Sequence, residues 1–134
     1  MKIYCTICSR EKNTGHSLLP AIRRYASERI HSVHEKSKAD KVEFRILSGR
    51  FGLLAPDEKI PFYDHLLVSD EIKETKQIVK AQMIREDIDE VVFFMENLAE
   101  HPNWQAYYEV IRQACSELNI KFQEEIITDG DALN

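Results

Sequence analysis

The 134-residue chain has few of the residues that mark several classes of protein. Its three cysteines are an odd number without framework spacing, which argues against a disulfide-stapled domain and favours reduced thiols in a reducing compartment. No apolar run approaches the ~20 residues that cross a bilayer, and the N-terminal MKIYCTIC is strand-like, without a cleavage-site pattern. We therefore expect a cytoplasmic protein that does not enter a membrane.

Positive charge is also scarce, because 18 lysines and arginines face 23 aspartates and glutamates, a net charge of −5. This balance argues against a broad electrostatic contact with nucleic acid, although basic residues spread along the chain leave room for a local patch. Direct DNA binding is disfavoured, and a small anionic or polar ligand is the expected partner. The chain lacks repeats and interdomain linkers, which predicts one domain over residues 1–127 and a polar tail at 128–134.

Four short segments have the pattern of β-strands. Residues 3–8 and 91–95 are nearly continuous apolar runs, typical of strands that are covered on both faces. Residues 42–46 and 120–122 alternate between apolar and polar side chains, typical of strands with one face or one edge near water. The first two are predicted to be central strands and the other two to be edge strands.

Three helical patterns separate these strands. Residues 18–33 and 102–118 carry apolar stripes at helical spacing, and Pro102 suits a first helical turn. The weaker pattern between them begins with Ser69 as the expected N-cap. The alternation predicts the α/β class: a single three-layer Rossmann-like domain with helices on both faces of a four-stranded, mainly parallel sheet in the order 2-1-3-4.

This strand order predicts a ligand crevice beyond the C-terminal ends of the first and third strands, where the order reverses direction. The turn at residues 8–12 places Ser9, Arg10 and Lys12 at that crevice, where they could meet a phosphate or carboxylate. Its spacing matches neither a dinucleotide-binding glycine fingerprint nor a P-loop. Polar residues are commonplace in such turns, so the predicted ligand role depends on the position of the turn.

The stretch at residues 47–67, LSGRFGLLAPDEKIPFYDHLL, is the most informative part of the chain. An apolar strand leads into a loop that is longer than most connections in compact domains, and such loops are often binding loops or lids. Gly49 and Gly52 allow backbone conformations that are closed to other residues and a close approach of the main chain to a ligand. This loop is therefore the predicted functional site.

Five polar side chains of the loop are candidates for binding or catalysis: Arg50, Asp57, Glu58, Tyr63 and Asp64. The arginine could clamp an anion, the first two acids could bind ribose hydroxyls or act as acid and base, and the last two residues could orient a ring. A plain structural explanation competes with each role, since the acids could build a turn and the arginine could pair with a nearby acid. Both interpretations stay open.

Cysteines and histidines give no clear metal or redox motif. Cys5 and Cys8 are three apart on a predicted strand and point to opposite faces, so they cannot share a metal or form a disulfide. His31 and His34 lack a third ligand at helical spacing, and His65 is a candidate general base by location alone. No metal and no cofactor are predicted, and Cys8 is kept as a remote nucleophile candidate.

Three segments together resemble the bacterial YaaA-like domain family. They are the CS-x-x-K turn at residues 8–12, LSGRFGLL at 47–54 and PDEKIPFYDHLL at 56–67, with a weaker similarity at Tyr108. Arg50 stands where the family often has lysine, and the spacing of the final proline and tyrosine also departs from its pattern. The resemblance implies a Rossmann-like domain with one polar site formed by Ser9, Lys12, Ser48, Arg50, Gly52, Asp57, Tyr63 and Asp64.

The family carries a peroxide-stress label, and it is distantly similar to domains of enzymes that handle modified guanine bases. The resemblance therefore implies a nucleoside- or nucleotide-binding enzyme that acts at a glycosidic bond, as an N-glycosidase or glycosyl transferase. The expected catalytic residues are Asp57, Glu58 and Tyr63, because a positioned carboxylate would stabilise positive charge at the sugar. The expected substrate-binding residues are Ser9, Arg10, Lys12, Ser48, Arg50, Gly52, Asp64 and Tyr108. The alternative is a non-catalytic, nucleotide-like ligand-binding or stress-response module.

Overall fold

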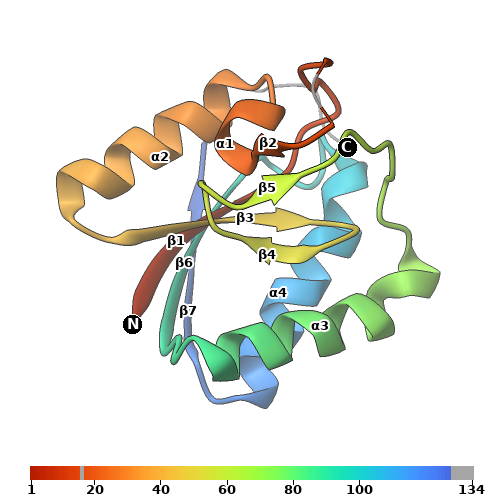
Figure 1. The fold of residues 1–134 in the computed structure, drawn as a ribbon. Helices are drawn as coiled ribbons and strands as arrows, with labels where there is room; N and C mark the ends of the chain where they lie inside the picture. Colours follow the sequence, from red (N-terminus) through yellow and green to blue (C-terminus); the bar gives the residue numbers. More distant parts are fainter. Residues whose placement is uncertain (16, 128–134) are drawn as a thin grey trace.

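Runs of apolar, β-forming residues build the central sheet of the computed structural model, which describes residues 1–15 and 17–127 (Figure 1). The sheet has five strands, and all of them are parallel except the short outermost strand β4. In spatial order they are β4 (Gly52–Leu54), β3 (Glu43–Ser48), β1 (Lys2–Ile7), β6 (Glu90–Met95) and β7 (Lys121–Ile126).

The α/β class and the mainly parallel sheet are confirmed, but the prediction of four strands is wrong. The four expected strands lie side by side as β3-β1-β6-β7, and β4 adds a fifth, antiparallel strand outside β3. The predicted second strand is therefore not an edge. The chain can turn back into β4 because Gly52 adopts a φ of 73°, in the left-handed region that favours glycine.

Helices cover both faces of the sheet. Tyr4 and Arg45 point to opposite faces, because Tyr4 pairs with Phe44 in neighbouring strands. The Tyr4 hydroxyl donates to Asp40 of α2 (Glu28–Asp40) at 2.6 Å. Arg45 instead binds Glu86, which follows α3 (Ile72–Arg85), and α3 packs against α4 (Gln105–Glu117). The layers are thus α2, the sheet, and the pair α3 and α4 (Figure 1).

The single helix predicted over residues 18–33 is wrong, because the segment forms two helices. The short α1 (Ala21–Arg24) ends where Tyr25 adopts an extended conformation, and Ser27 then caps α2 by accepting from the Ile30 amide at 3.3 Å. Two-residue strands β2 (Leu19–Pro20) and β5 (Lys59–Ile60) pair just before α1, so they tie the long loop to this region.

The other two helices begin with 3₁₀ turns. The turn η1 (Ser69–Glu71) precedes α3, so Ser69 lies inside a turn and its predicted N-cap role is wrong. The turn η2 (Pro102–Trp104) precedes α4, and Pro102 occupies the first turn as expected. The apolar stripe of α4 is buried at Tyr107, Val110, Ile111, Ala114 and Cys115.

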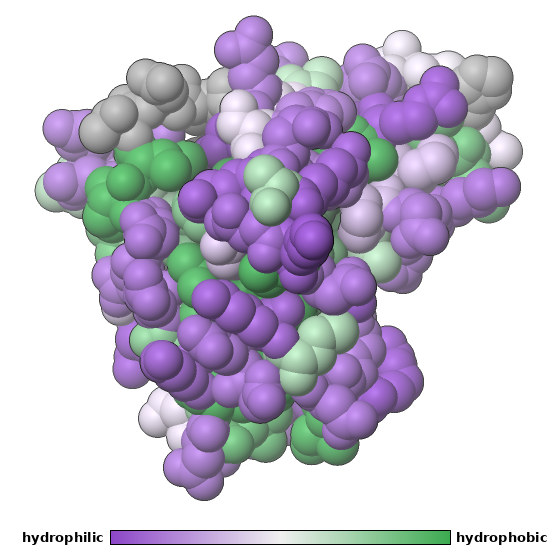
Figure 2. Space-filling view, turned by 90° about the vertical axis from the view of Figure 1, so that its left-hand side faces the viewer, coloured by the Kyte–Doolittle hydropathy of each residue, from purple (hydrophilic) through white to green (hydrophobic). Residues whose placement is uncertain are grey.

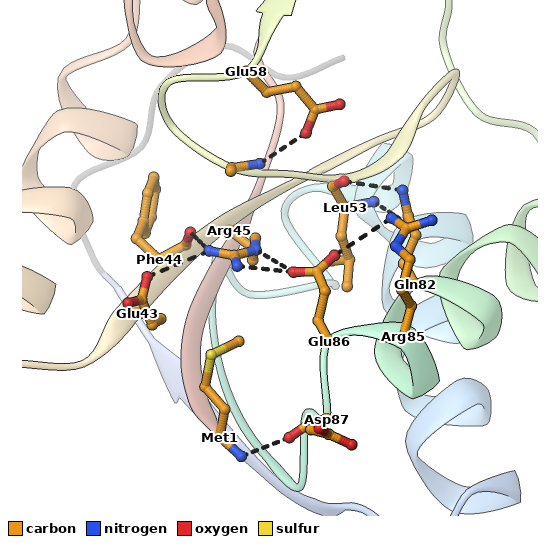
Figure 3. A network of polar contacts seen from close by, with 11 residues as sticks. Met1, Glu43, Phe44, Arg45, Leu53, Glu58, Gln82, Arg85, Glu86 and Asp87 are labelled. Carbon is orange, nitrogen blue, oxygen red and sulfur yellow. Dashed lines mark hydrogen bonds and ion pairs between the residues drawn. The ribbon is translucent and has the colours of Figure 1, made fainter.

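Figure 3 shows how α3 is fixed to the β3–β4 hairpin. The Gln82 side chain accepts from the Leu53 amide at 2.7 Å and donates to the carbonyls of Phe51 and Leu53 at 3.1 Å each. The Arg45 guanidinium binds Glu86 through Nε at 2.9 Å and Nη2 at 2.8 Å. The side chain of Gln82 thereby satisfies backbone groups along the edge strand β4, which would otherwise invite pairing with another chain.

One hydrophobic cluster runs through the described residues, from both faces of the sheet into the helices. The face drawn in Figure 2 is mainly hydrophilic, and its hydrophobic residues appear in small groups between polar ones. Within residues 1–15 and 17–127, no helix combines the length and the apolar character needed to span a bilayer.

Candidate functional site

The candidate site lies at the C-terminal ends of β1 and β3, at the same end of the sheet as the predicted crevice, which was expected between β1 and β6. The Cys8 amide donates to the Leu47 carbonyl at 2.9 Å, which extends the pairing of these two strands to their ends. Ser9 is buried, and its hydroxyl donates to the Glu11 carbonyl at 2.8 Å to shape the turn after β1. The turn is fixed to the segment after α1 by the pairing of Lys12 with Tyr25.

A hydroxyl cluster, formed by Tyr25, Ser48 and Tyr63, is buried beneath this turn. The Ser48 Oγ accepts from the amides of Arg50 and Phe51 at 3.1 Å each and lies 2.9 Å from the Tyr63 hydroxyl. Because both amides already occupy the Oγ lone pairs, Ser48 donates its own proton to Tyr63. The Tyr63 hydroxyl also contacts that of Tyr25 at 2.5 Å, so the cluster joins β3, the long loop and the end of α1.

A thiol and a third phenol lie next to this cluster. Cys8 is buried, and its Sγ is 3.8 Å from the hydroxyl of Tyr107 on α4. That hydroxyl in turn accepts from the Leu67 amide at 3.1 Å. Burial raises the pKa of the Tyr25, Tyr63 and Tyr107 phenols, so all three are protonated at neutral pH and act as hydrogen-bonding groups.

Lys12 covers the hydroxyl cluster. Its Nζ lies 4.7 Å from the centre of the Tyr63 ring and 5.8 Å from that of Tyr25, within the range of a cation–π contact. Among the described residues its single hydrogen bond is a long one, 3.4 Å to the Arg10 carbonyl. Burial lowers the pKa of Lys12, although Cys8, Asp64 and Glu11 oppose the shift. The ammonium is therefore partly desolvated and has no ion-pair partner within the described part of the chain.

A second group of polar atoms lies at the end of β1, toward β6. The buried Arg29 donates to the Thr6 hydroxyl at 2.7 Å and to the Ile7 carbonyl at 2.8 Å, and its guanidinium stacks on Trp104 at 4.9 Å. Within residues 1–15 and 17–127, the buried indole N–H of Trp104 finds no acceptor. The buried Glu96 follows β6 and lies 3.8 Å from His101. A buried guanidinium and a buried carboxyl group thus lie near the ends of β1 and β6.

Two of the predicted binding residues, Arg50 and Asp64, lie at a separate hollow of about 370 Å³ between the long loop and the start of α3. His65 and Glu71 also line it, and their Nε2 and Oε2 atoms are 2.9 Å apart. The Arg50 guanidinium stacks on Phe51 at 5.3 Å and makes no ion pair with another described residue. The loop therefore does not bring all its polar residues to one place.

Two of the predicted catalytic residues belong to a turn instead. Asp57 and Glu58 are exposed in the connection between β4 and β5, and the Glu58 carboxylate accepts from the Ala55 amide at 3.3 Å. The Glu58 carbonyl accepts from the amide of Ala21 at the start of α1. Within the described residues neither acid bonds to the hydroxyl cluster or to Lys12, and Tyr63 is the one predicted catalytic residue that belongs to the cluster.

Three further residues of the expected substrate-binding set, Gly52, Tyr108 and Arg10, do not belong to the hydroxyl cluster. A Cβ on Gly52 would lie 2.5 Å from the Gln82 Oε1, so this glycine permits the close approach of α3. Tyr108 points toward β7, where its hydroxyl donates to Glu124. Arg10 is exposed at the turn after β1. Of the substrate-binding set, Ser9, Lys12 and Ser48 are the residues that come together.

Several residues at the site were missed from the sequence. Tyr107 faces Cys8, whereas the resemblance to the YaaA-like family pointed to its neighbour Tyr108, and helical spacing places both tyrosines on the apolar stripe without distinguishing them. Tyr25 and Arg29 fall within the single helix predicted over residues 18–33, and no local sequence pattern indicated that they lie near the strand ends. Among the described residues, no three His, Cys, Asp or Glu side chains are grouped as metal ligands.

Comparisons with known proteins add no assignment. No family model, curated protein or solved structure matches the chain. The similarity to the YaaA-like family therefore stays a prediction from three sequence segments. The chemistry of the site has to be inferred from its own residues.

Proposed function

We propose that the chain binds a small ligand carrying a phosphate or carboxylate, of the nucleotide class, at the C-terminal ends of β1 and β3. The observation that carries the proposal is the Lys12 ammonium, which is half-buried over Tyr63 and forms no ion pair with a described residue, although Asp64 and Glu11 lie near enough to act on its charge. A desolvated cation attracts an anion more strongly than one in bulk water. Binding an anion would also compensate the cost of burying this charge.

The position of Lys12 supports a nucleotide-like ligand. In open α/β sheets, ligands bind beyond the carboxyl ends of the strands next to the point where the strand order reverses. Here that point lies at β1, because the chain passes from β1 to β3 on one side and later to β6 on the other side, and Lys12 lies in the turn that follows β1. The rings of Tyr25 and Tyr63 contact the Lys12 ammonium, and hydrogen bonds among the cluster hydroxyls fix these two tyrosines.

Cleavage at a glycosidic bond has weaker support, so the non-catalytic binding module is our preferred form of the proposal. Asp57 and Glu58 are exposed in a turn that contacts α1, whereas an acid or base must reach the reacting group. If the chain nevertheless releases a free base from nucleotides, loss of release in Asp57→Asn or Glu58→Gln would identify the acting acid. Unchanged release in both variants would remove those two assignments.

A thermal-shift titration tests the binding proposal. Guanosine, guanosine monophosphate, ribose 5-phosphate and inorganic phosphate are compared on the parent chain and on Lys12→Gln. The exposed Lys73 of α3, changed to glutamine, is the matched control because it removes the same charge away from the site. We expect phosphate-bearing ligands to raise the melting temperature of the parent and of Lys73→Gln but not of Lys12→Gln.

Two results would contradict the proposal. Equal stabilisation of Lys12→Gln and the parent by the same ligand would separate the ligand from Lys12. No stabilisation by any phosphate- or carboxylate-bearing probe, with all three proteins folded, would count against a small anionic ligand altogether.

A further inference from the structure

The two edges of the sheet are protected to different degrees. The edge strand β4 has three residues, and Gln82 of α3 hydrogen-bonds its backbone. The opposite edge strand, β7, has six residues, contains neither proline nor glycine, and pairs with β6 in an unbroken register. No other described strand pairs with its outer edge. An edge of this length that no described strand covers is a template for pairing with another chain, provided that its charged side chains find opposite charges on that chain.

The backbone groups that β7 offers can be identified by alternation. The amides of Lys121 and Ile127 donate to carbonyls of Asp89 and Met95, on the β6 side. Because neighbouring residues in a strand bond to opposite sides, the N–H and C=O groups of Phe122, Glu124 and Ile126 point outward. A second strand that pairs here must match these outward residues with its own.

We propose that β7 pairs with β7 of a second copy of this chain, antiparallel and centred on Gln123, so that two sheets join into one. In this register Phe122 faces Glu124 of the second copy, and each such pair exchanges both of its backbone hydrogen bonds. Lys121 then lies opposite Glu125 of the second copy, and the two-fold axis repeats the pair. Opposite charges directly across two strands stabilise the pairing.

Other registers that match outward residues fit less well. Centring on Glu124 would place two glutamates directly opposite one another, which is destabilising. Centring on Phe122 would place Lys121 opposite Gln123 and leave Glu125 facing a residue before β7. In the register centred on Gln123, Lys121 of each copy faces Glu125 of the other copy, and no two residues of like charge face one another. The self-complementary sequence of β7 is thus what selects a second copy as the partner.

Charge reversal provides the test, measured by sedimentation velocity on the full chain from about 1 µM to about 1 mM. We expect a dimer with twice the 15.7 kDa mass of one chain. Lys121→Glu and Glu125→Lys should each weaken it roughly tenfold, because each creates two like-charged pairs. The double variant Lys121→Glu, Glu125→Lys restores opposite charges and should recover the parent affinity.

Lys2→Glu is the matched control, because it reverses a charge that acts only within one chain. Lys2 and Lys121 both lie 3.8 Å from Glu90, but Lys2 belongs to β1, away from the β7 edge. We expect Lys2→Glu to leave dimer formation unchanged. Glu124→Pro removes an outward N–H without removing a β6–β7 bond and should give a monomer.

A monomer over the whole concentration range would overturn the proposal. A dimer of unchanged affinity in Glu124→Pro and in both charge variants would do so too, because the contact would then lie elsewhere. Failure of the swapped double variant to recover affinity would reject the register centred on Gln123.

Discussion

At the scale of single residues, the Tyr63 hydroxyl holds the candidate site together. It contacts the hydroxyls of Tyr25 and Ser48 in a place closed to water, so its removal leaves both partners with an unmet hydrogen bond. We expect Tyr63→Phe to lower the free energy of unfolding by about 1–2 kcal/mol. Tyr108→Phe is the control, since that hydroxyl contacts Glu124 at the surface, and it should cost less in urea denaturation.

An equal loss in the two tyrosine variants would show that the buried cluster contributes no more than a surface hydrogen bond. The Tyr63 ring itself remains in the phenylalanine variant, so its contact with Lys12 is retained. Ligand stabilisation in Tyr63→Phe should therefore persist, in contrast to Lys12→Gln.

Gly52 is a second residue with a specific structural demand. Its φ of 73° disfavours any side chain, and a Cβ would lie 2.5 Å from the Gln82 Oε1. Gly15, with a φ of 88°, has nothing within 4 Å of its Cβ position, so Gly15→Ala carries backbone strain alone. We expect Gly52→Ala to cost about 2 kcal/mol or more and Gly15→Ala about 1 kcal/mol by urea denaturation. Equal costs would mean that the contact with Gln82 relaxes freely.

At the scale of elements, α3 and α4 are joined by a cluster of charges. Glu117 of α4 binds Lys76 at 2.7 Å and Lys80 at 2.8 Å, both on α3. Hydrogen bonds to these two lysines lower the pKa of Glu117 from its ordinary 4.5 to about 2. The folded state thus releases this proton more readily than the unfolded state, so the stabilisation is present above pH 4.5 and is lost as the pH falls toward 2.

We therefore expect Glu117→Gln to flatten part of the loss of stability between pH 4.5 and pH 2, and to lower stability at neutral pH. The measurement is urea denaturation at a series of pH values. Glu74→Gln, an exposed position of α3 without an ion pair to another described residue, is the control and should follow the parent curve. A parent-like curve for Glu117→Gln would show that solvent screens these exposed pairs.

At the scale of the whole molecule, one hydrophobic cluster connects the sheet with its helices. Trp104 is the single tryptophan of the chain and is fully buried in this cluster, so its fluorescence reports on tertiary packing. Circular dichroism reports on the helices. We expect the two signals to give coincident denaturation curves, as for a cooperative single domain. Separate transitions would show that the α2 layer and the α3–α4 layer unfold independently.

Sequence reasoning predicted that some polar residues gather at the strand ends, and the structure shows this for part of the expected set. Ser9, Lys12, Ser48 and Tyr63 come together as expected, because the ends of neighbouring parallel strands meet at one edge of a sheet. Asp57 and Glu58 do not join them, since the loop first forms β4 and then turns toward α1. The sequence indicated a polar loop of unusual length, but no local pattern in it predicted the direction in which the loop folds.

The sequence by itself determined the α/β class, the four long strands and the α4 stripe, because these depend on local periodicity and on continuous apolar runs. Tertiary structure alone decided that Tyr107 rather than Tyr108 faces Cys8, that α1 and α2 are separate, and that β4 closes one edge. These features depend on contacts between residues far apart in the chain. The Gly52–Gln82 and Tyr25–Tyr63 contacts are examples, and a local pattern carries no information about them.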